Sequence, residues 1–363
     1  MIDSECNIAI RRGEIVLTNH REAQLNLDES TAHPLVSICI PTYNGGRWIA
    51  ECIASALNQT YEPLEILIVD DGSTDNTVET VRAAEDPRVR LVVNSSNRGL
   101  VGNWNQCVRL AQGRFIKFLF QDDAFYPPCI GAMMRMFATH PDLGMVFARR
   151  DFVVEPDAPA ELAREIVGHY SDQHLRFDDV QAVNNGRRLF AQHVAKGLDQ
   201  SCIAEPPSTL IRREVFQRLG LFNTRMRQAC DIEMWLRIMF YYDIGFVDEK
   251  LLMFRIHGKS ATAFNRSTRK AQYDRFWMLA GLLRYPEIKA AYPEITTWQA
   301  DLLEGYRKAQ IRPTAGWRSI RTKDGLREAV RDFREMPGRL RFLNDADGPG
   351  ENSPPLHPRL EGV

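Results

Sequence analysis

The sequence predicts an α/β fold built on a mixed, mainly parallel sheet flanked by helices. Two observations lead to this prediction. Short apolar runs alternate with segments of helical period between residues 35 and 120, and polar clusters follow several of these runs. The chain has 363 residues, of which 44% are hydrophobic and 26% charged, so it can bury a large core.

The first half of the chain alternates strand and helix at short spacing. Apolar runs predict buried strands over residues 35–40, 64–69, 89–93 and 114–120. The segments between them predict helices over residues 47–57, 76–84 and 101–111. Such alternation favours parallel strands joined by right-handed crossovers, and ligands of these sheets bind beyond the carboxyl ends of the strands.

The second half is less regular. It predicts strands over residues 146–154 and 251–256, with a polar excursion at 155–175. Helices are expected over residues 186–197, 212–218, 231–242, 268–284 and 295–310. We divide the chain into an N-terminal extension (1–33) with a strand or small hairpin, a main domain (34–263), a helical C-terminal region (264–343) and a disordered tail (344–363).

Composition limits the classes of function. The net charge of −1 gives no general attraction for polyanions, so we expect no nucleic-acid partner. The seven cysteines are an odd number without a Cys-x-x-Cys pair, which indicates buried free thiols in a reducing compartment. We find no signal-peptide pattern and no apolar stretch of membrane-spanning length. We therefore expect a soluble, cytoplasmic protein.

Three polar clusters follow predicted strands. They are Pro41, Thr42, Tyr43, Asn44 and Gly45, then residues 70–75, then residues 121–123. Together they would bring an aromatic ring and several carboxylates to one crevice. A nucleotide needs such groups: a ring against the base, a carboxylate for base or ribose, and carboxylates for a cation at the diphosphate.

Simpler interpretations exist for the same clusters. Residues 70–75 could be a turn followed by a helix N-cap, and Asp122 and Asp123 could belong to an ordinary polar turn. Other nucleotide-binding and catalytic motifs are easier to exclude. The sequence has no G-x-G-x-x-G after the first strand, no G-x-x-x-x-G-K-[ST] and no G-x-S-x-G.

The ordered set of motifs resembles the family 2 glycosyltransferases, which have the Rossmann-like GT-A fold. The matching segments are residues 36–44, 65–75, 97–100, 118–123, 230–237 and 255–260. The resemblance implies a nucleotide-sugar-binding half (34–145) and an acceptor half (146–263). It implies that the donor is bound by Pro41, Thr42, Tyr43, Asn44, Asp71, Asn97, Asp122 and Arg255.

The resemblance also implies a divalent metal, Mg²⁺ or Mn²⁺. Asp123 would be its direct carboxylate ligand. Asp122 would contact the ribose or hydrogen-bond to a group that binds the metal. His257 would reach the metal or the diphosphate. Asp71 would accept from the N–H of the base, against which Tyr43 would pack.

Asp231 is the implied catalytic base. Inverting transfer is a single displacement, so a carboxylate must take the proton of the acceptor hydroxyl as the new bond forms. Asp231 precedes an apolar helix, so it could instead serve only as a helix cap. Two positions depart from the family. Phe120 stands where an acid is common, and Cys230 replaces the glutamate that commonly precedes the base.

The segment 306–343 is markedly basic, with apolar residues at rough helical spacing. It could lie on an anionic membrane near a lipid-linked acceptor, or it could be a solvated helix packed on the main domain. We favour the packed helix slightly, because its acids are spaced to pair with its bases.

Three functions are weighed. The first is an inverting, metal-dependent glycosyltransferase that uses a UDP- or dTDP-sugar and a glycan or lipid-linked acceptor, in polysaccharide biosynthesis. The second is a sugar-1-phosphate nucleotidyltransferase, which would need a Gly-rich basic loop that residues 41–47 match poorly. The third is a non-catalytic module that binds nucleotide sugar. The sequence leaves the sugar, the acceptor and the oligomeric state open.

Overall fold

The computed structural model describes residues 8–11, 14–17, 33–198, 201–260 and 274–311. Near the N-terminus, β1 (Ile8–Arg11) and β2 (Glu14–Leu17) pair antiparallel, with Ile10 opposite Ile15. This confirms the small hairpin expected in residues 1–33. The predicted tail 344–363 and most of the basic segment 306–343 lie outside the described residues.

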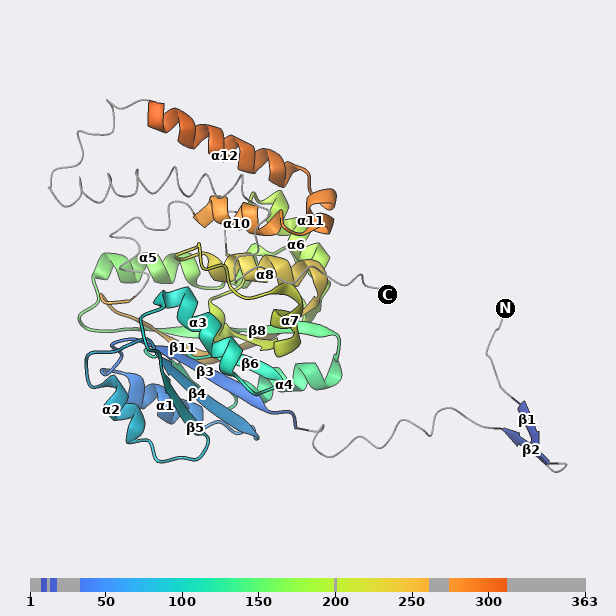
Figure 1. The fold of residues 1–363 in the computed structure, drawn as a ribbon, viewed down its shortest axis with the longest axis horizontal. Helices are drawn as coiled ribbons and strands as arrows, with labels where there is room; N and C mark the ends of the chain where they lie inside the picture. Colours follow the sequence, from blue (N-terminus) through green and yellow to red (C-terminus); the bar gives the residue numbers. More distant parts are fainter. Residues whose placement is uncertain (1–7, 12–13, 18–32, 199–200, 261–273, 312–363) are drawn as a thin grey trace.

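Within the described chain, nine strands form one mixed sheet (Figure 1). Its first half is parallel, in the order β5-β4-β3-β6. These strands are β3 (Val36–Thr42), β4 (Leu64–Asp70), β5 (Val89–Val93) and β6 (Phe115–Phe118). The crossover helices are α1 (Ile49–Leu57), α2 (Thr77–Arg82) and α3 (Gly99–Leu110). All seven elements were predicted from the sequence within a few residues.

The second half makes the sheet mixed. Strand β10 lies antiparallel between β6 and β8, whereas β11 runs parallel to β8. The short strands β7 and β9 pair antiparallel with β11. The bounds are β7 (Ala124–Phe125), β8 (Leu143–Val154), β9 (Val183–Asn184), β10 (Thr209–Arg212) and β11 (Asp243–Ile256).

The helices of the second half follow the prediction, with two additions. They are α4 (Cys129–Thr139), α5 (Ala160–Tyr170), α6 (Gly186–Ala195), α7 (Arg213–Leu219) and α8 (Cys230–Tyr241), with 3₁₀ turns η2 (Gln173–Arg176) and η3 (Pro206–Ser208). Helix α4 was not predicted, and α5 lies in the expected polar excursion. Helix α5 buries only Ala163 and Ile166, so its apolar stripe is narrow and easily missed.

The sheet is covered on both faces. Ile38 and Ile40 of β3 pack into a cluster with α1 and α4, while Cys39 between them packs into a second cluster with α3, α6 and α8. This alternation is the period of two that a strand imposes on its side chains. The parallel strands therefore sit between two layers of helices (Figure 1), and the carboxyl ends of β3, β4 and β6 stay free for ligands.

The helices after residue 263 pack into the same core as the main domain. They are α10 (Asp274–Leu282), α11 (Pro286–Ala291) and α12 (Glu294–Ile311). Trp277, Leu282 and Ile288 belong to the cluster that contains α8. In the part of the chain that the structure describes, no helix combines the length and the apolar content needed to span a membrane.

Candidate active site

A pocket of about 970 Å³ opens where β3, β4 and β6 end. Its wall includes ten of the eleven residues that the sequence singled out. They are Pro41, Thr42, Tyr43, Asn44, Asp71, Asn97, Asp122, Asp231, Arg255 and His257. The remaining one, Asp123, is not part of the wall. The fold thus brings the three strand-end clusters together with the two downstream motifs.

The turn after β3 is held by Gln121. Its Oε1 accepts hydrogen bonds from Thr42 Oγ1 at 2.6 Å and from the Tyr43 N–H at 2.8 Å, while its Nε2 donates to the Tyr43 carbonyl at 3.2 Å. The Tyr43 side chain remains 49% exposed at the pocket. The ring is therefore free to pack against a planar ligand while its backbone is fixed.

The first two polar clusters, residues 41–45 and 70–75, are joined by hydrogen bonds. The Asn44 N–H donates to Ser73 Oγ at 2.8 Å, and Asn44 Oδ1 accepts from the Thr74 N–H at 2.8 Å. Asp70 Oδ2 accepts from the N–H groups of Gly72 and Ser73. Gly72 has φ +83°, which favours glycine. Asp70 therefore stabilises a turn, as the simpler interpretation of residues 70–75 expected.

Asp71 holds the start of α3. Its carboxylate accepts from Asn94 Nδ2 at 2.8 Å and from the N–H groups of Arg98 and Gly99 at 2.8–3.0 Å. Asn97 Nδ2 donates to the Asp71 carbonyl at 3.0 Å. Two consecutive acids after β4 therefore have separate structural tasks, and Asp71 keeps limited capacity for one further donor.

Asp122 and His257 form a pair at the pocket. His257 Nε2 lies 2.9 Å from Asp122 Oδ2, and the Asp122 side chain is 21% exposed. The imidazole packs against the ring of Trp48, with centroids 4.2 Å apart. Because both side chains line the pocket, a carboxylate oxygen and a ring nitrogen meet at its wall.

Asp123 lies beneath this pair and is only 2% exposed. Its Oδ1 accepts from the Arg255 N–H at 2.9 Å, and its buried Oδ2 has no hydrogen-bond partner among the described residues. Burial and the nearby Asp122 charge raise the pKa of Asp123. Asp122 is the member of the pair that presents its carboxylate to the pocket, and the assignment of Asp123 as the metal ligand stays a prediction.

Arg255 is already engaged within the protein. Its Nη2 contacts Glu51 at 2.7 Å, its Nη1 pairs with Glu155, and its Nε donates to the Asp122 carbonyl at 2.8 Å. Five donors make arginine suitable for such a junction. This side chain fixes the backbone of the Asp122 turn and also lines the pocket, so its contact with the donor stays a prediction.

Asp231 lies in the first turn of α8 and lines the same pocket. Burial raises the pKa of Asp231 to about 7, and the nearby charges of Glu205 and Asp274 act in the same direction. Its Oδ1 accepts from the Ile232 N–H at 2.8 Å, a donor of the first turn of α8, so Asp231 also stabilises the start of this helix. Burial, together with the nearby charges of Asp231 and Asp274, raises the pKa of the Cys230 thiol, which leaves it protonated and inert.

The comparisons with known proteins now become informative. The sequence profile of glycosyl transferase family 2 matches residues 37–220, just over half of the chain. The chain belongs to glycosyl transferase family 2. The resemblance inferred from the motifs is thereby confirmed, and the protein is a glycosyltransferase.

Relatives of this glycosyltransferase include an uncharacterized protein of Mycobacterium tuberculosis, which is 33% identical over 75% of this chain and 85% of that protein. A chondroitin synthase of Pasteurella multocida is 39% identical over 34% of this chain but only 13% of the synthase. An uncharacterized glycosyltransferase of Rickettsia felis is 27% identical, and the matched region is 35% of its length.

The same fold occurs in solved structures. The crystal structure of Staphylococcus aureus TarS 1–349 in complex with UDP-GlcNAc superposes with a TM-score of 0.53 at 16% identity, covering 81% of this chain and 78% of that chain. At this identity the likeness shows a shared fold. It confirms the GT-A type of the glycosyltransferase.

Several residues of the glycosyltransferase pocket carried no sequence signal. Asp274 accepts from the N–H groups of Arg227, Gln228 and Ala229 at 2.6–3.1 Å, just before α8. Glu205 precedes η3 and lies near Asp231. Neither follows a predicted strand, and Asp274 lies beyond the boundary we expected at residue 263. Their charge next to a candidate base becomes visible only in the folded chain.

Proposed function

We propose that this glycosyltransferase moves a sugar from a nucleoside diphosphate sugar to a hydroxyl of a glycan or lipid-linked acceptor, with inversion at the anomeric carbon. One observation carries the proposal. Asp231, with a pKa raised to about 7, lines the same pocket as the Asp122–His257 pair. A base and a diphosphate-binding pair in one pocket are the groups that a single displacement requires.

The donor is proposed to be a UDP- or dTDP-sugar. Tyr43 offers an exposed ring and Asp71 an acidic partner, a combination that suits a pyrimidine. The chondroitin synthase and a hyaluronan synthase of Pasteurella multocida are relatives, and TarS was solved with UDP-GlcNAc. These relatives support a nucleotide-sugar donor and a role in polysaccharide biosynthesis.

The Asp122–His257 pair could supply part of the ligands of a divalent cation, but not a complete set of protein ligands. Among the described residues, no three His, Cys, Asp or Glu side chains converge on one point. Mg²⁺ is commonly held by one or two carboxylates together with substrate phosphates. Asp122 and His257 would therefore hold the cation jointly with the donor. When bound, it would offset the charge that develops on the departing diphosphate.

The protein groups have defined tasks in the transfer. The oxygen of the acceptor hydroxyl forms a bond to the anomeric carbon of the donor, and the bond from that carbon to the diphosphate oxygen breaks. The hydroxyl proton passes to an oxygen of Asp231. Asp274 fixes the turn that precedes this carboxylate, and Arg255 fixes the turn that carries Asp122.

The test is hydrolysis of the donor in the presence of Mn²⁺, with water as the acceptor. UDP-, dTDP- and GDP-sugars are screened, and free nucleoside diphosphate is followed by NMR. We expect release from one donor, its loss with EDTA, and a decrease of roughly 10²–10⁴-fold in Asp231→Asn with donor affinity retained. The exposed Asp248→Asn variant is the matched control.

Full turnover by Asp231→Asn would remove this residue from the mechanism. Nucleotide binding without any release, even with acceptors supplied, would favour a binding module. Pyrophosphate exchange on a sugar 1-phosphate would favour a nucleotidyltransferase.

A further inference from the structure

The pocket is larger than the donor-binding residues require. Its volume of about 970 Å³ is at the upper end of the range for small-molecule sites. The strand-end residues form one side of it. The other side is formed by residues from β8, α5, η2 and the segment before η3, among them Arg150, Phe152, Tyr170, Gln173 and Glu205. This second side can take a second substrate.

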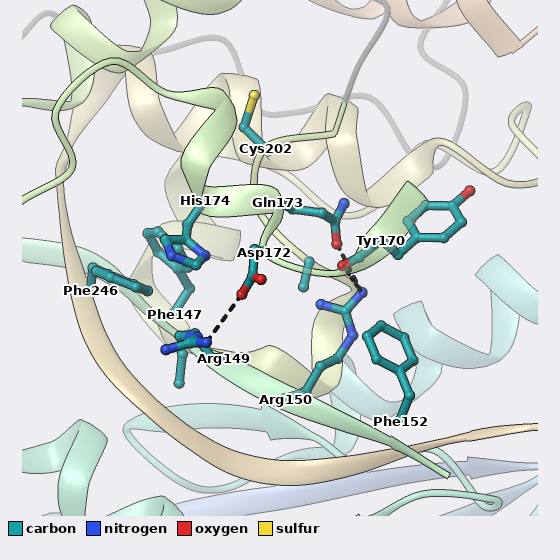
Figure 2. A pocket seen from close by; sticks show the side chains of 12 residues that line it. Phe147, Arg149, Arg150, Phe152, Tyr170, Asp172, Gln173, His174, Cys202 and Phe246 are labelled. Carbon is teal, nitrogen blue, oxygen red and sulfur yellow. Dashed lines mark hydrogen bonds and ion pairs between the residues drawn. The ribbon is translucent and has the colours of Figure 1, made fainter. Parts of the chain in front are cut away.

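Arg150 is the buried centre of that side. Its side chain is 6% exposed, and its guanidinium lies over the rings of Phe152 at 4.9 Å and Phe254 at 5.7 Å. Its Nη2 donates to Gln173 Oε1 at 2.8 Å and to the Tyr170 carbonyl at 3.4 Å. Figure 2 shows Arg150 between Gln173 and Phe152. Such a side chain has one fixed position.

Glu205 is held beside Arg150 without a well-formed hydrogen bond. Glu205 Oε1 lies 2.7 Å from Arg150 Nε, an ion pair whose alignment is too poor for a hydrogen bond, and among the described residues neither atom has another partner. The Glu205 side chain is 16% exposed and lines the pocket, so part of the carboxylate group stays accessible to a ligand.

The charges indicate what kind of ligand fits. The Arg150 charge is balanced by Glu205, and both side chains line the pocket, the carboxylate being the more exposed of the two at 16% against 6%. A carboxylate repels phosphates and uronates but accepts strongly from hydroxyl groups. The neighbouring ring of Phe152 offers an apolar surface for the C–H face of a sugar.

We propose that Glu205 binds a hydroxyl group of a neutral saccharide acceptor and that Arg150 positions Glu205 for this contact. The inference rests on the proposed transferase function and specifies the acceptor side of the same pocket. The bound ring would place a neighbouring hydroxyl toward Asp231, which lines the pocket near Glu205. Glu205 is thus an acceptor-binding residue, and Arg150 is a positioning residue.

The adjacent Arg149 provides a matched control. Figure 2 shows Arg149 directed to Asp172, and it also pairs with Asp248. It lines a small cavity of about 20 Å³ that shares Arg150, Phe152, Tyr170 and Gln173 with the large pocket, but Arg149 itself is not part of the wall of the large pocket. Removing this charge on the same strand should leave the acceptor side unchanged.

The experiment measures how well methyl glycosides compete with water as acceptors of the donor sugar. Wild-type enzyme, Glu205→Gln, Glu205→Asp and Arg149→Gln are incubated with the hydrolysed donor and Mn²⁺ at pH 8, where Asp231 is ionised. The probes are the methyl β-glycosides of glucose, galactose and N-acetylglucosamine, with methyl β-glucuronide as the anionic counterpart of the glucoside. Free sugar and transfer product are quantified together.

We expect at least one neutral glycoside to divert sugar in the wild type, and the glucuronide to do so less well than the glucoside. In Glu205→Gln the half-diverting concentration should rise about 10-fold or more, while hydrolysis continues. Glu205→Asp keeps the negative charge beside Arg150, so an effect in this variant cannot be ascribed to a buried arginine without a counter-charge. Because the aspartate side chain is shorter, this variant should also need a higher half-diverting concentration. Arg149→Gln should match the wild type.

Each failure has its own meaning. Absence of donor hydrolysis in the wild type would overturn the proposed function itself. Hydrolysis without diversion by any neutral glycoside, or better diversion by the glucuronide, would overturn the neutral saccharide acceptor. Unchanged diversion in both Glu205 variants, or an equal effect in Arg149→Gln, would remove Glu205 from acceptor binding.

Discussion

The ionisation of Asp231 determines the pH dependence expected at the level of single residues. Its pKa is raised to about 7, so the carboxylate is mostly protonated below pH 7 and mostly ionised above it. A general base acts only in its ionised form. We therefore predict that kcat/KM for donor hydrolysis falls about tenfold per pH unit below 7 and levels off above it.

A rate profile from pH 5 to 9 checks this, and a plateau that extends below pH 6 would contradict it. Cys230→Ser is a suitable comparison. It leaves the acids near Asp231 in place, so its acid limb should coincide with that of the wild type.

Asp122 and Asp123 are neighbours with opposite surroundings, which gives a second prediction. Asp122 shares the pocket with His257, whereas Asp123 is buried and accepts from the Arg255 N–H. Asp122→Asn should raise the Mn²⁺ concentration needed for half-maximal hydrolysis at least tenfold. Asp123→Asn keeps an oxygen for Arg255 and should change this value little.

Manganese titrations of both variants at saturating donor provide the measurement. The reverse order would restore Asp123 as the ligand, as the motif alone suggests. In neither case do we expect tight Mn²⁺ binding without donor, because the described residues offer no complete cage.

The candidate residues were visible in the sequence because each follows a strand or opens a helix. Their partners were not. Asp71 meets Asn94 and Arg98, and Arg255 meets Glu51, 204 residues away in the chain. A motif shows which side chains come to the pocket, but it does not show that β11 covers Asp123 and leaves Asp122 partly exposed.

At the scale of elements, one carboxylate of α10 holds the turn that precedes α8. Asp274 is 4% exposed and accepts from three consecutive backbone N–H groups before α8. Asp274→Ala would leave those donors buried without partners, which should lower the free energy of unfolding by about 1–3 kcal/mol. Because this turn precedes Asp231, turnover should fall as well.

Asp274→Asn is the control for this prediction, since its amide oxygen can still accept from the turn. It should lose less stability than the alanine variant in thermal unfolding. Equal stability of Asp274→Ala and wild type would show that the turn is held by other contacts.

The elements also show where the sequence pattern stops being informative. The strands β3 to β6 are apolar runs with crossover helices, so their type and position along the chain followed from local periodicity. Strand β10 is only four residues long, and the antiparallel pairing that makes the sheet mixed involves residues about 65 and 95 positions earlier in the chain. Such pairing leaves no local trace.

At the scale of the whole molecule, the core decides where the catalytic unit ends. Phe276, Trp277, Leu279 and Leu282 are buried in the same cluster as α8, and Ile288 and Ile295 extend it. The buried Glu233–Arg237 ion pair also reaches this region, because Arg237 Nη1 lies 3.4 Å from Tyr285 Oη. The boundary suggested by motifs at residue 263 therefore cuts through a packed interior.

Two truncations test this conclusion. A chain that ends at residue 263 loses all of those buried apolar side chains. Each typically contributes about 2–5 kcal/mol against a total stability of about 5–15 kcal/mol. We predict that it does not fold. A chain that ends at residue 311 keeps every described core residue, so it should unfold cooperatively near the full-length melting temperature and hydrolyse the donor. Cooperative unfolding of the shorter chain, followed by circular dichroism, would show that α10 to α12 are dispensable.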